Sequence, residues 1–500
     1  MLAQAAYTRN RPRSYLYTGM QKKRNTLPVF LAGFAGAVFF LWMKVTLYDK
    51  LEYEHDVFSV LQLSRDFLRG KPLLYENAYG YDGRLHNYYL VPFYSVFTVF
   101  FGGKGLFVAG FAAMVWALVL AARIFPRLPV WKGLLFVLFF FSPAAFYLWD
   151  NYRFGWHPET LFYPLSVVFV SAHVLRYRTS AWISGACILL TREDGVLLLW
   201  SLYMLYLAAA YPGPLRQTIK KRGMYTSAAA GVFMAGMAWL YFMSGMQSRT
   251  GETARRFLQA YSRPVLLQYL GACFGYWALW CLPVLLAAWL SARRFSFIAW
   301  SLAGLLPLLA VNLYSGAYYF PDPTYGINWA PRLAGTYGYI TAALWLSLVY
   351  GRQTGRGNAY GPLFLLAGVL VCYLQYDGLK RLPYYYRYSV PDRIHLALFR
   401  HSPVEKDLQT LERLRRLAER IPSGYPVRMD RHLFALFDRT DYIWPERGRN
   451  PWRTPRLVIT ARDTENAEPM PHAFEPLGRI GRYEIWADPE NKDIRKFLED

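Results

Sequence analysis

The chain has 500 residues, of which 54% are hydrophobic and only 18% are charged, and its formal net charge is +23. Soluble domains carry about 25% charged residues, so the composition argues against a series of ordinary soluble domains. The positive charge does not indicate a nucleic acid partner, because the basic residues of the first 377 positions gather in short loops between long apolar runs. The composition instead favours a membrane protein whose partners include membrane lipids.

Apolar runs of about twenty residues recur along the chain, and a helix of that length crosses the hydrocarbon core of a bilayer. Lys44 is the one charged residue inside the clearest runs. Its place near the end of the first run predicts that its ammonium group reaches outward to the bilayer surface. The clearest runs are Val29–Tyr48, Leu106–Ala122, Gly133–Trp149, Met224–Met243, Val265–Leu290, Phe297–Tyr314 and Gly361–Tyr376.

Basic and acidic residues alternate between successive loops. Residues 1–26 are basic and free of acids, and every acid before residue 378 falls in a segment between the basic loops. Short loops rich in Lys and Arg remain in the cytoplasm. The pattern predicts a multi-pass protein of the plasma membrane (the inner membrane in a bacterium), with a cytoplasmic N-terminus and a first span retained as a signal anchor. The other acid-free basic loops are 123–132, 176–178, 216–222, 293–294 and 352–356.

The first predicted span is followed by a long outer segment, residues 49–104. It contains an amphipathic stretch, Val57–Leu68, and a short apolar stretch, Tyr88–Phe101, that is too short to cross and is expected to lie in the interface. Residues 181–211 predict two short helices joined by a charged turn. With further crossings at 105–122, 133–149, 160–175, 224–244, 265–291, 296–318, 334–350 and 360–377, the pattern gives about eleven spans.

The composition changes after residue 377, where charged residues become frequent and no apolar run is long enough to span. Leucines at helical spacing predict a helix over Leu408–Ile421. Short β-like runs follow at Pro426–Met429, Leu457–Thr460 and Arg482–Trp486. The sequence thus predicts a mainly α protein with three parts: a cytoplasmic basic segment (1–26), a transmembrane helix bundle (27–377) and an extracytoplasmic α/β domain (378–500).

Two polar clusters lie in the long first outer segment. Glu54 and Asp56 follow the first span, where a carboxylate could act as a general base or bind a metal ion. The equal alternative is a helix start, because Asp at that position caps a helix and complements its dipole. His86 precedes the short apolar stretch and could move protons, although a histidine among tyrosines is more often an ordinary interfacial residue.

Two further polar clusters lie between later apolar runs, at residues 149–159 and 192–194. The string Trp149–Glu159 combines Arg153, His157 and Glu159 with aromatic residues, a mixture that suits a sugar. An interfacial aromatic belt explains the tryptophans but not the three polar residues. Arg192, Glu193 and Asp194 interrupt an apolar segment, where ionisable residues are costly and indicate function; the alternative is a surface turn with Arg192 paired to Glu193.

The last cluster is the loop Phe320–Arg332, whose prolines stiffen it and whose Arg332 could bind a phosphate. A plain connector is the equal alternative. The sequence contains no phosphate-binding P-loop, no nucleophile elbow and no His-Glu-x-x-His zinc motif. The functional expectation therefore rests on five polar clusters that face one compartment.

Several short motifs together resemble a known family. They are His55-Asp56-Val57-Phe58 with Gln62, His86 with Pro92, Phe154–Glu159, Arg192-Glu193-Asp194, and Ile421–Val427 with Trp444-Pro445. The chain resembles the membrane proteins called domain of unknown function 2079 and, more broadly, GT-C-type glycosyltransferases. The resemblance covers most of the chain from about residue 50.

The resemblance implies a GT-C-like fold and a sugar donor carried on a polyprenyl phosphate, with an active site facing away from the cytoplasm. It implies Asp56 as the catalytic base, with Glu54 as second choice. His157 and Glu159 would orient the sugar or acceptor, and Arg153, Arg192 or Arg332 would stabilise the phosphate. The string departs from the Asp-Asp or Asp-Glu pair of several such enzymes, which leaves the base and the need for a divalent metal open.

Two other functions remain open from the sequence. One is a transporter or flippase for a lipid-linked or small solute, which would need polar residues near mid-span and, in many folds, repeated halves. The sequence shows neither a repeat nor many such residues. The other is a non-catalytic scaffold whose outer domain binds partners in the cell envelope.

Overall fold

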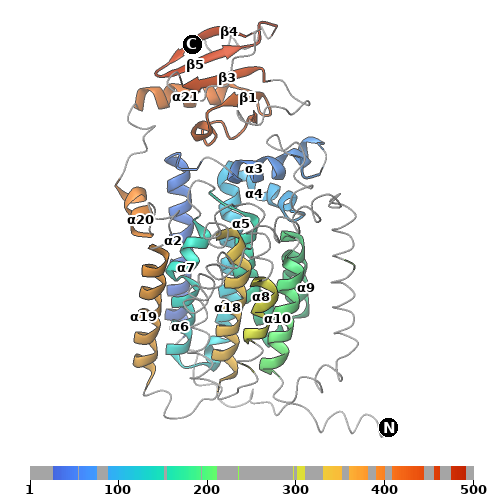
Figure 1. Ribbon diagram of the computed structural model, residues 1–500, viewed down its shortest axis with the longest axis vertical. Coiled ribbons are helices and arrows are strands. Elements are labelled where there is room, and N and C mark those ends of the chain that lie inside the picture. Colours follow the sequence, from blue (N-terminus) through green and yellow to red (C-terminus); the bar gives the residue numbers. More distant parts are fainter. Residues whose placement is uncertain are drawn as a thin grey trace, which may run out of the picture.

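The chain folds into a long helical bundle with a small β-sheet beyond one end (Figure 1). The mainly helical composition and the C-terminal sheet confirm the coarse prediction of the fold class. The computed structural model describes residues 26–53, 56–71, 73–75, 88–150, 155–192, 194–210, 301–309, 330–351, 360–380, 390–399, 408–443, 455–461 and 474–490, together with positions 235 and 297.

Within the described residues, four helical stretches are long and apolar enough to cross a membrane. The predicted number of about eleven spans is therefore not supported. Two of the expected crossings, 224–244 and 265–291, lie outside the described residues except for position 235, and only part of 296–318 is described. The four stretches are Thr26–Asp49, Val91–Arg127, Val130–Trp149 and Pro158–Leu175.

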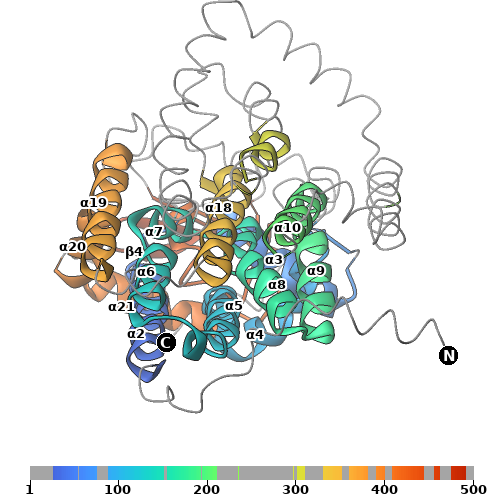
Figure 2. The ribbon, with the colours of Figure 1, turned by 90° about the horizontal axis from the view of Figure 1, so that it is seen from below.

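The helices of the bundle pack around α8 and α18. Viewed along its length (Figure 2), α18 lies between the α6–α7 pair and α8, and it contacts all three. Helix α2 packs on α5 and α6, and α5 also packs on α8. The bundle helices are α2 (Thr26–Asp49), α5 (Gly105–Ala122), α6 (Val130–Phe140), α7 (Pro143–Trp149), α8 (Phe162–Leu175), α9 (Arg178–Thr191), α10 (Gly195–Ala210), α18 (Ala330–Tyr350) and α19 (Gly361–Lys380).

One predicted span and one long apolar run are interrupted for local reasons. The crossing expected at 133–149 is split between α6 and α7, where Pro143 starts α7 and the Ser142 hydroxyl accepts a hydrogen bond from the backbone NH of Ala145. The apolar run that begins at Val91 is broken at Gly102, whose φ is +61°. A residue with a side chain rarely adopts that conformation, so the chain turns there before α5 begins.

Short helices cross the end of the bundle nearest the sheet (Figure 1). The amphipathic stretch forms α3 (Asp56–Asp66) and the 3-10 turn η2 (Phe67–Arg69), and the short apolar stretch forms η4 (Val91–Tyr94) and α4 (Ser95–Phe101). The predicted pair of short helices in 181–211 is also present as α9 and α10. The sequence pattern therefore correctly predicted the short elements α3 and α4 at the end of the bundle and the helix pair α9 and α10.

The C-terminal sheet has five strands in the order β2-β1-β3-β5-β4. Strands β2, β1 and β3 are parallel, whereas β5 pairs antiparallel with β3 and β4. The amphipathic helix α21 (Leu408–Arg420) leads into the sheet and buries its leucines. The strands are β1 (Pro426–Met429), β2 (Asp441–Ile443), β3 (Leu457–Ala461), β4 (Glu475–Ile480) and β5 (Tyr483–Ala487).

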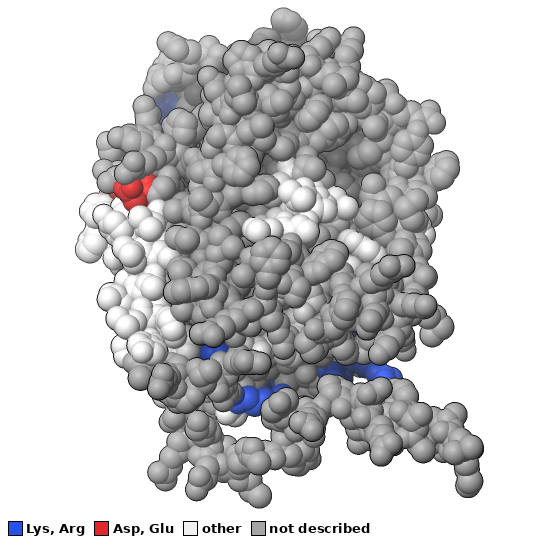
Figure 3. Space-filling model, turned by 60° about the horizontal axis from the view of Figure 1, so that its bottom comes forward, with Lys and Arg blue, Asp and Glu red and all other residues white. Residues whose placement is uncertain are grey.

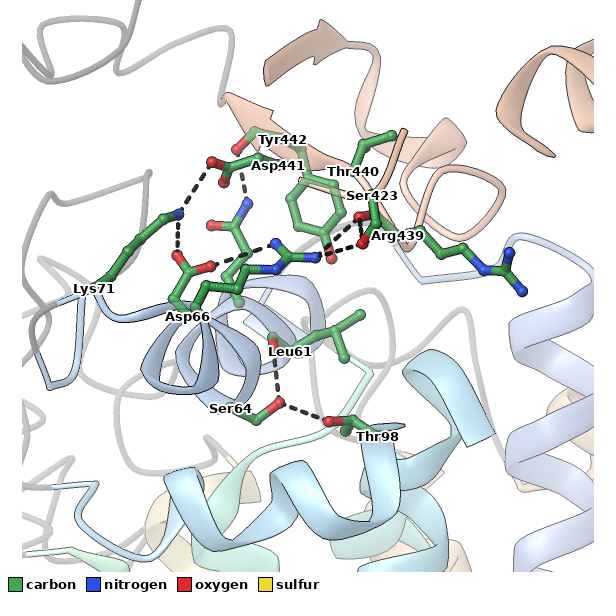
Figure 4. A network of polar contacts seen from close by, with 12 residues as sticks. Leu61, Ser64, Asp66, Lys71, Thr98, Ser423, Arg439, Thr440, Asp441 and Tyr442 are labelled. Carbon is green, nitrogen blue, oxygen red and sulfur yellow. Dashed lines mark hydrogen bonds and ion pairs between the residues drawn. The ribbon is translucent and has the colours of Figure 1, made fainter. Parts of the chain in front are cut away.

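The sheet is tied to the bundle through α3 (Figure 4). The Gln62 side chain donates a hydrogen bond of 2.8 Å to the backbone oxygen of Tyr442. Lys71 bridges Asp66 on α3 and Asp441 at the start of β2, with its ammonium nitrogen 3.0 Å from the Asp441 carboxylate. Because Asp66 and Asp441 are buried, these charges hold the two parts in a defined register.

The outer surface of the bundle is largely apolar. On the face shown in Figure 3, most described side chains are uncharged, and the basic ones gather mainly along the lower edge. Helices α2 and α19 expose large apolar side chains, including Leu31, Trp42, Leu366 and Tyr373. An apolar band bounded by charge suits a bilayer, and it agrees with the four membrane-length helices.

Candidate functional site

The candidate site begins with a carboxylate and an imidazole at the top of the bundle. Asp56 stands in the first turn of α3, where the helix dipole favours its negative charge, so the helix-start alternative holds as well. The Nε2 atom of His157 lies 3.3 Å from the Asp56 carboxylate. The Asp56 side chain is 35% exposed, whereas that of His157 is 7% exposed. Solvent therefore reaches the pair from the Asp56 side.

Behind His157 the polar chain continues into the protein. The other ring nitrogen, Nδ1, lies 3.9 Å from the Glu159 carboxylate, which is 2% exposed. Glu159 accepts hydrogen bonds from Arg192 at 2.8 Å and from the Tyr88 hydroxyl at 2.9 Å. Arg192 also lies 3.5 Å from the Asp194 carboxylate. The structure thus joins Asp56, His157, Glu159, Arg192 and Asp194 in one array, called here the Asp56–Asp194 array.

The loop before His157 is shaped by a glycine. Gly155 has φ of +77°, and a Cβ atom there would lie 2.9 Å from Val57 and 3.1 Å from Tyr53. Both the conformation and the space therefore require glycine. His157 then precedes the 3-10 turn η7 (Pro158–Leu161), in which Glu159 is the second residue. This close approach of the loop to α3 is what brings His157 to Asp56.

The aromatic residues of the same string do not form an open sugar platform. Trp149 and Trp156 are buried, with exposed fractions of 1% and 0%. The Trp149 indole NH donates a 2.9 Å hydrogen bond to the backbone oxygen of Phe40, and Trp156 packs edge-on against Tyr94 with ring centroids 5.4 Å apart. The expectation that these rings contact a sugar is wrong for the two tryptophans, because core packing takes up their surface.

A second group of buried charges lies beside the array. Asp150 receives hydrogen bonds from the Arg393 guanidinium at 2.6 and 3.2 Å and from the Tyr53 hydroxyl at 2.7 Å. The Lys44 ammonium lies 3.1 Å from the same carboxylate and also donates to the backbone oxygen of Gly155. These four side chains, Lys44, Tyr53, Asp150 and Arg393, are called here the Asp150 cluster.

The Asp150 cluster corrects the prediction for Lys44. The side chain does not reach outward to the bilayer surface, because it is fully buried and paired with Asp150. Burial by itself would raise the pKa of Asp150, but Arg393 and Lys44 outweigh it and hold that pKa well below its ordinary value. The carboxylate is therefore ionised, and its charge is balanced from two sides.

Several predicted site residues are not placed. Glu54, His86, Arg153 and Glu193 lie outside the described residues, so the alternative pairing of Arg192 with Glu193 stays open beside its contacts with Glu159 and Asp194. Arg332 lies in the first turn of α18, but its side chain is outside the described part of the chain.

Sequence reasoning missed Lys44, Tyr53, Tyr88 and Arg393 as members of the two groups. A lysine inside an apolar run was a usable signal, because a buried ammonium needs a partner. Arg393 gave no such signal, since it lies in a polar stretch far along the chain.

In the part of the chain that the structure describes, no group of three or more His, Cys, Asp or Glu side chains is arranged to hold a metal ion. The chemistry that the described residues offer is that of a partly exposed carboxylate supported by a buried histidine and a buried Glu–Arg pair.

Comparison of the chain with family models, curated proteins and solved structures yields no match. The resemblance to GT-C-type glycosyltransferases therefore remains a prediction from the motifs.

Proposed function

We propose that the protein is a membrane glycosyltransferase that moves a sugar from a polyprenyl-phosphate donor to an acceptor on the non-cytoplasmic side. The observation that supports this most is the Asp56–Asp194 array, in which one carboxylate meets solvent while its partners are buried. A general base needs both an accessible oxygen and a fixed orientation. Asp56 has the first, and His157 supplies the second.

In the proposed reaction the Asp56 carboxylate accepts the proton of an acceptor hydroxyl. The hydroxyl oxygen then attacks the anomeric carbon of the donor, and the bond to the polyprenyl phosphate breaks with both electrons leaving on the phosphate. The anomeric configuration inverts in this single displacement. The negative charge that develops on the phosphate needs a nearby cation.

Arg192 is poorly placed to bind the phosphate and is better suited to supporting the site. Its guanidinium is 8% exposed and already binds the carboxylates of Glu159 and Asp194. It therefore acts on the site by holding Glu159 behind His157. The phosphate-binding role falls to Arg153 or Arg332 in this proposal.

The proposed placement in the membrane follows the charge pattern. Helix α3, which begins at Asp56, lies at the end of the bundle near the sheet, whereas the turn between α5 and α6 lies at the other end (Figure 1). Glu159 and Asp194 belong to the same array as Asp56, and the turn carries Arg123 and Arg127. With basic turns in the cytoplasm, the site and the sheet face outward. The GT-C-like bundle of about eleven spans and an acceptor-selecting role for residues 378–500 belong to the same proposal.

The direct test uses purified protein in lipid nanodiscs with a panel of polyprenyl-phosphate sugars. Wild-type protein should release polyprenyl phosphate from one of them, and Asp56→Asn should reduce that rate by at least about 10²-fold, since a positioned base contributes about 10²–10⁴-fold. Asp49→Asn is the matched control, because Asp49 ends α2 at the same end of the bundle, is 51% exposed and forms a surface ion pair with Lys104.

Two outcomes contradict the proposal. Full activity of Asp56→Asn removes Asp56 as the base. Movement of an intact lipid-linked sugar across the bilayer, without cleavage, favours the flippase alternative.

A further inference from the structure

The Asp150 cluster contacts both segments that carry the Asp56–His157 pair. Tyr53 precedes Asp56 by three residues and donates its hydroxyl hydrogen to Asp150. Gly155 precedes His157 by two residues, and its backbone oxygen accepts a hydrogen bond from Lys44, which pairs with Asp150. One buried carboxylate therefore holds the start of α3 and the loop before His157 at the same time.

The fourth member of the cluster comes from a distant part of the chain. Arg393 lies on α20 (Val390–Leu398), a short helix between the last bundle helix and the sheet domain. Its guanidinium makes two hydrogen bonds to Asp150 and lies 5.7 Å from the centre of the Tyr53 ring. It is 1% exposed, so α20 docks by inserting this side chain into the bundle.

A second contact fixes the same helix. The Lys50 ammonium at the end of α2 donates a 2.9 Å hydrogen bond to the backbone oxygen of Leu396. Helix α20 also packs against α2 and α7. Helix α20 is thus held against α2 and α7, the two helices that end just before Tyr53 and Asp150.

We propose that Arg393 is a positioning residue for the Asp56–His157 pair, so that docking of α20 completes the site. Without Arg393, Asp150 keeps Lys44 and Tyr53 but loses its bidentate partner, and the loop that carries His157 is less firmly held. A bidentate arginine restricts geometry more than a lysine does. The effect on catalysis rests on the proposed function, whereas the effect on geometry does not.

The test compares Arg393→Gln with Arg416→Gln in full-length protein. Arg416 is the matched control, because it is 67% exposed and pairs with Glu412 one turn away on the surface of α21. The geometric readout is the rate at which diethyl pyrocarbonate modifies His157, followed by peptide mass spectrometry. His432 in the sheet domain serves as the internal reference. Arg393→Gln should speed the modification of His157 severalfold and leave that of His432 unchanged.

The catalytic readout is the split between kcat and KM for the polyprenyl-phosphate sugar. Arg393→Gln should lower kcat by about 10²-fold, the typical cost of a misplacement of about 1 Å, with little change in KM. Arg393→Lys should recover part of that loss because it restores the charge. Tyr53→Phe, which removes only one hydroxyl, is the milder variant if Arg393→Gln does not fold, and it should raise the reactivity of His157 by a smaller factor.

The outcomes separate the two proposals. Unchanged reactivity of His157 in both Arg393→Gln and Tyr53→Phe overturns the positioning role, whatever happens to activity. If the wild-type protein transfers no sugar while Arg393→Gln still exposes His157, the glycosyltransferase proposal fails and the positioning role stands.

Discussion

At the scale of single residues, the protein buries two groups of charged side chains, one around Glu159 and Arg192 and one around Asp150. Glu159 and Arg192 form a buried pair whose atoms approach to 2.8 Å, and Asp150 is fully buried between two cations. Taking such charges out of water costs several kcal/mol for each ion, and replacing a buried pair by apolar residues is often neutral or stabilising. Both groups touch the segments around Asp56 and His157, which favours a functional reason for keeping them.

Arg192→Met should destabilise the protein by about 3–5 kcal/mol, because removal of one partner leaves the Glu159 charge buried with weaker compensation. The measurement is thermal unfolding of the purified protein in detergent. Arg416→Gln is the exposed control and should shift the free energy of unfolding by less than about 1 kcal/mol. Equal melting temperatures for the two variants would show that the buried pair contributes nothing beyond a surface pair.

The sequence indicated these residues in part. Arg192 and Asp194 were identifiable because they interrupt an apolar segment, and the close spacing of His157 and Glu159 placed both in one loop. Which residues pair was not identifiable, since contacts such as Asp56 with His157 or Lys44 with Asp150 join positions more than a hundred residues apart. Local spacing carries no information on such pairs.

At the scale of elements, α3 serves two neighbours. Its first residue, Asp56, belongs to the site. Its later residue Gln62 binds the sheet domain directly, and Asp66 does so through Lys71. A rigid helix links these two ends, so a change in the seating of the sheet moves the start of α3 as well. Helix α20, which precedes the sheet domain in the chain, is held to the bundle through Arg393.

The sheet domain contains its own titratable contact. His432 follows β1, and its Nε2 atom lies 2.8 Å from the Tyr483 hydroxyl. Burial, and to a smaller extent the nearby Arg482, lowers the pKa of His432 from an ordinary value of 6.5 to about 4. Between these two values the unfolded chain binds a proton that the folded domain does not, so stability falls as the pH falls from 6.5 to about 4.

The expected loss is at most about 3 kcal/mol, from about 1.4 kcal/mol for each pKa unit. The measurement is the melting temperature of full-length protein at pH 7 and pH 4.5 for wild type and His432→Gln. The wild type should lose more stability than the variant over this interval, because the variant lacks the titrating imidazole. A parallel decline in both proteins would contradict the assignment.

The sequence predicted elements with a strong local pattern and missed those without one. The leucine spacing of α21 and the β-branched run of β3 gave correct predictions. Strand β2 has only three residues, and β4 contains a proline and a glycine and buries few side chains. Both are formed by pairing with neighbours rather than by local preference. The split of one span at Ser142 and Pro143 was readable from the proline but was not predicted.

At the scale of the whole molecule, the charge pattern and the apolar runs gave the correct general architecture. Long apolar helices, a polar end with short crossing helices and a small sheet beyond it all appear in the structure (Figure 1). The predicted count of about eleven spans is not supported, because the described residues contain four membrane-length stretches. The crossings expected at 224–244 and 265–291 lie outside the described residues except for position 235. The assembly of the candidate site from separate segments could not be predicted, since it depends on the packing of α3 against η4 and of η7 against α9.

The most direct test of the glycosyltransferase account is the position of a bound lipid phosphate. A structure of the full-length protein in nanodiscs with polyprenyl phosphate should show the phosphate at the end of the bundle that carries the sheet, paired with Arg153 or Arg332 and not with the Asp56 carboxylate. Phosphate bound at the opposite end, near the α5–α6 turn, would contradict the account, because the Asp56–Asp194 array could not then act on it.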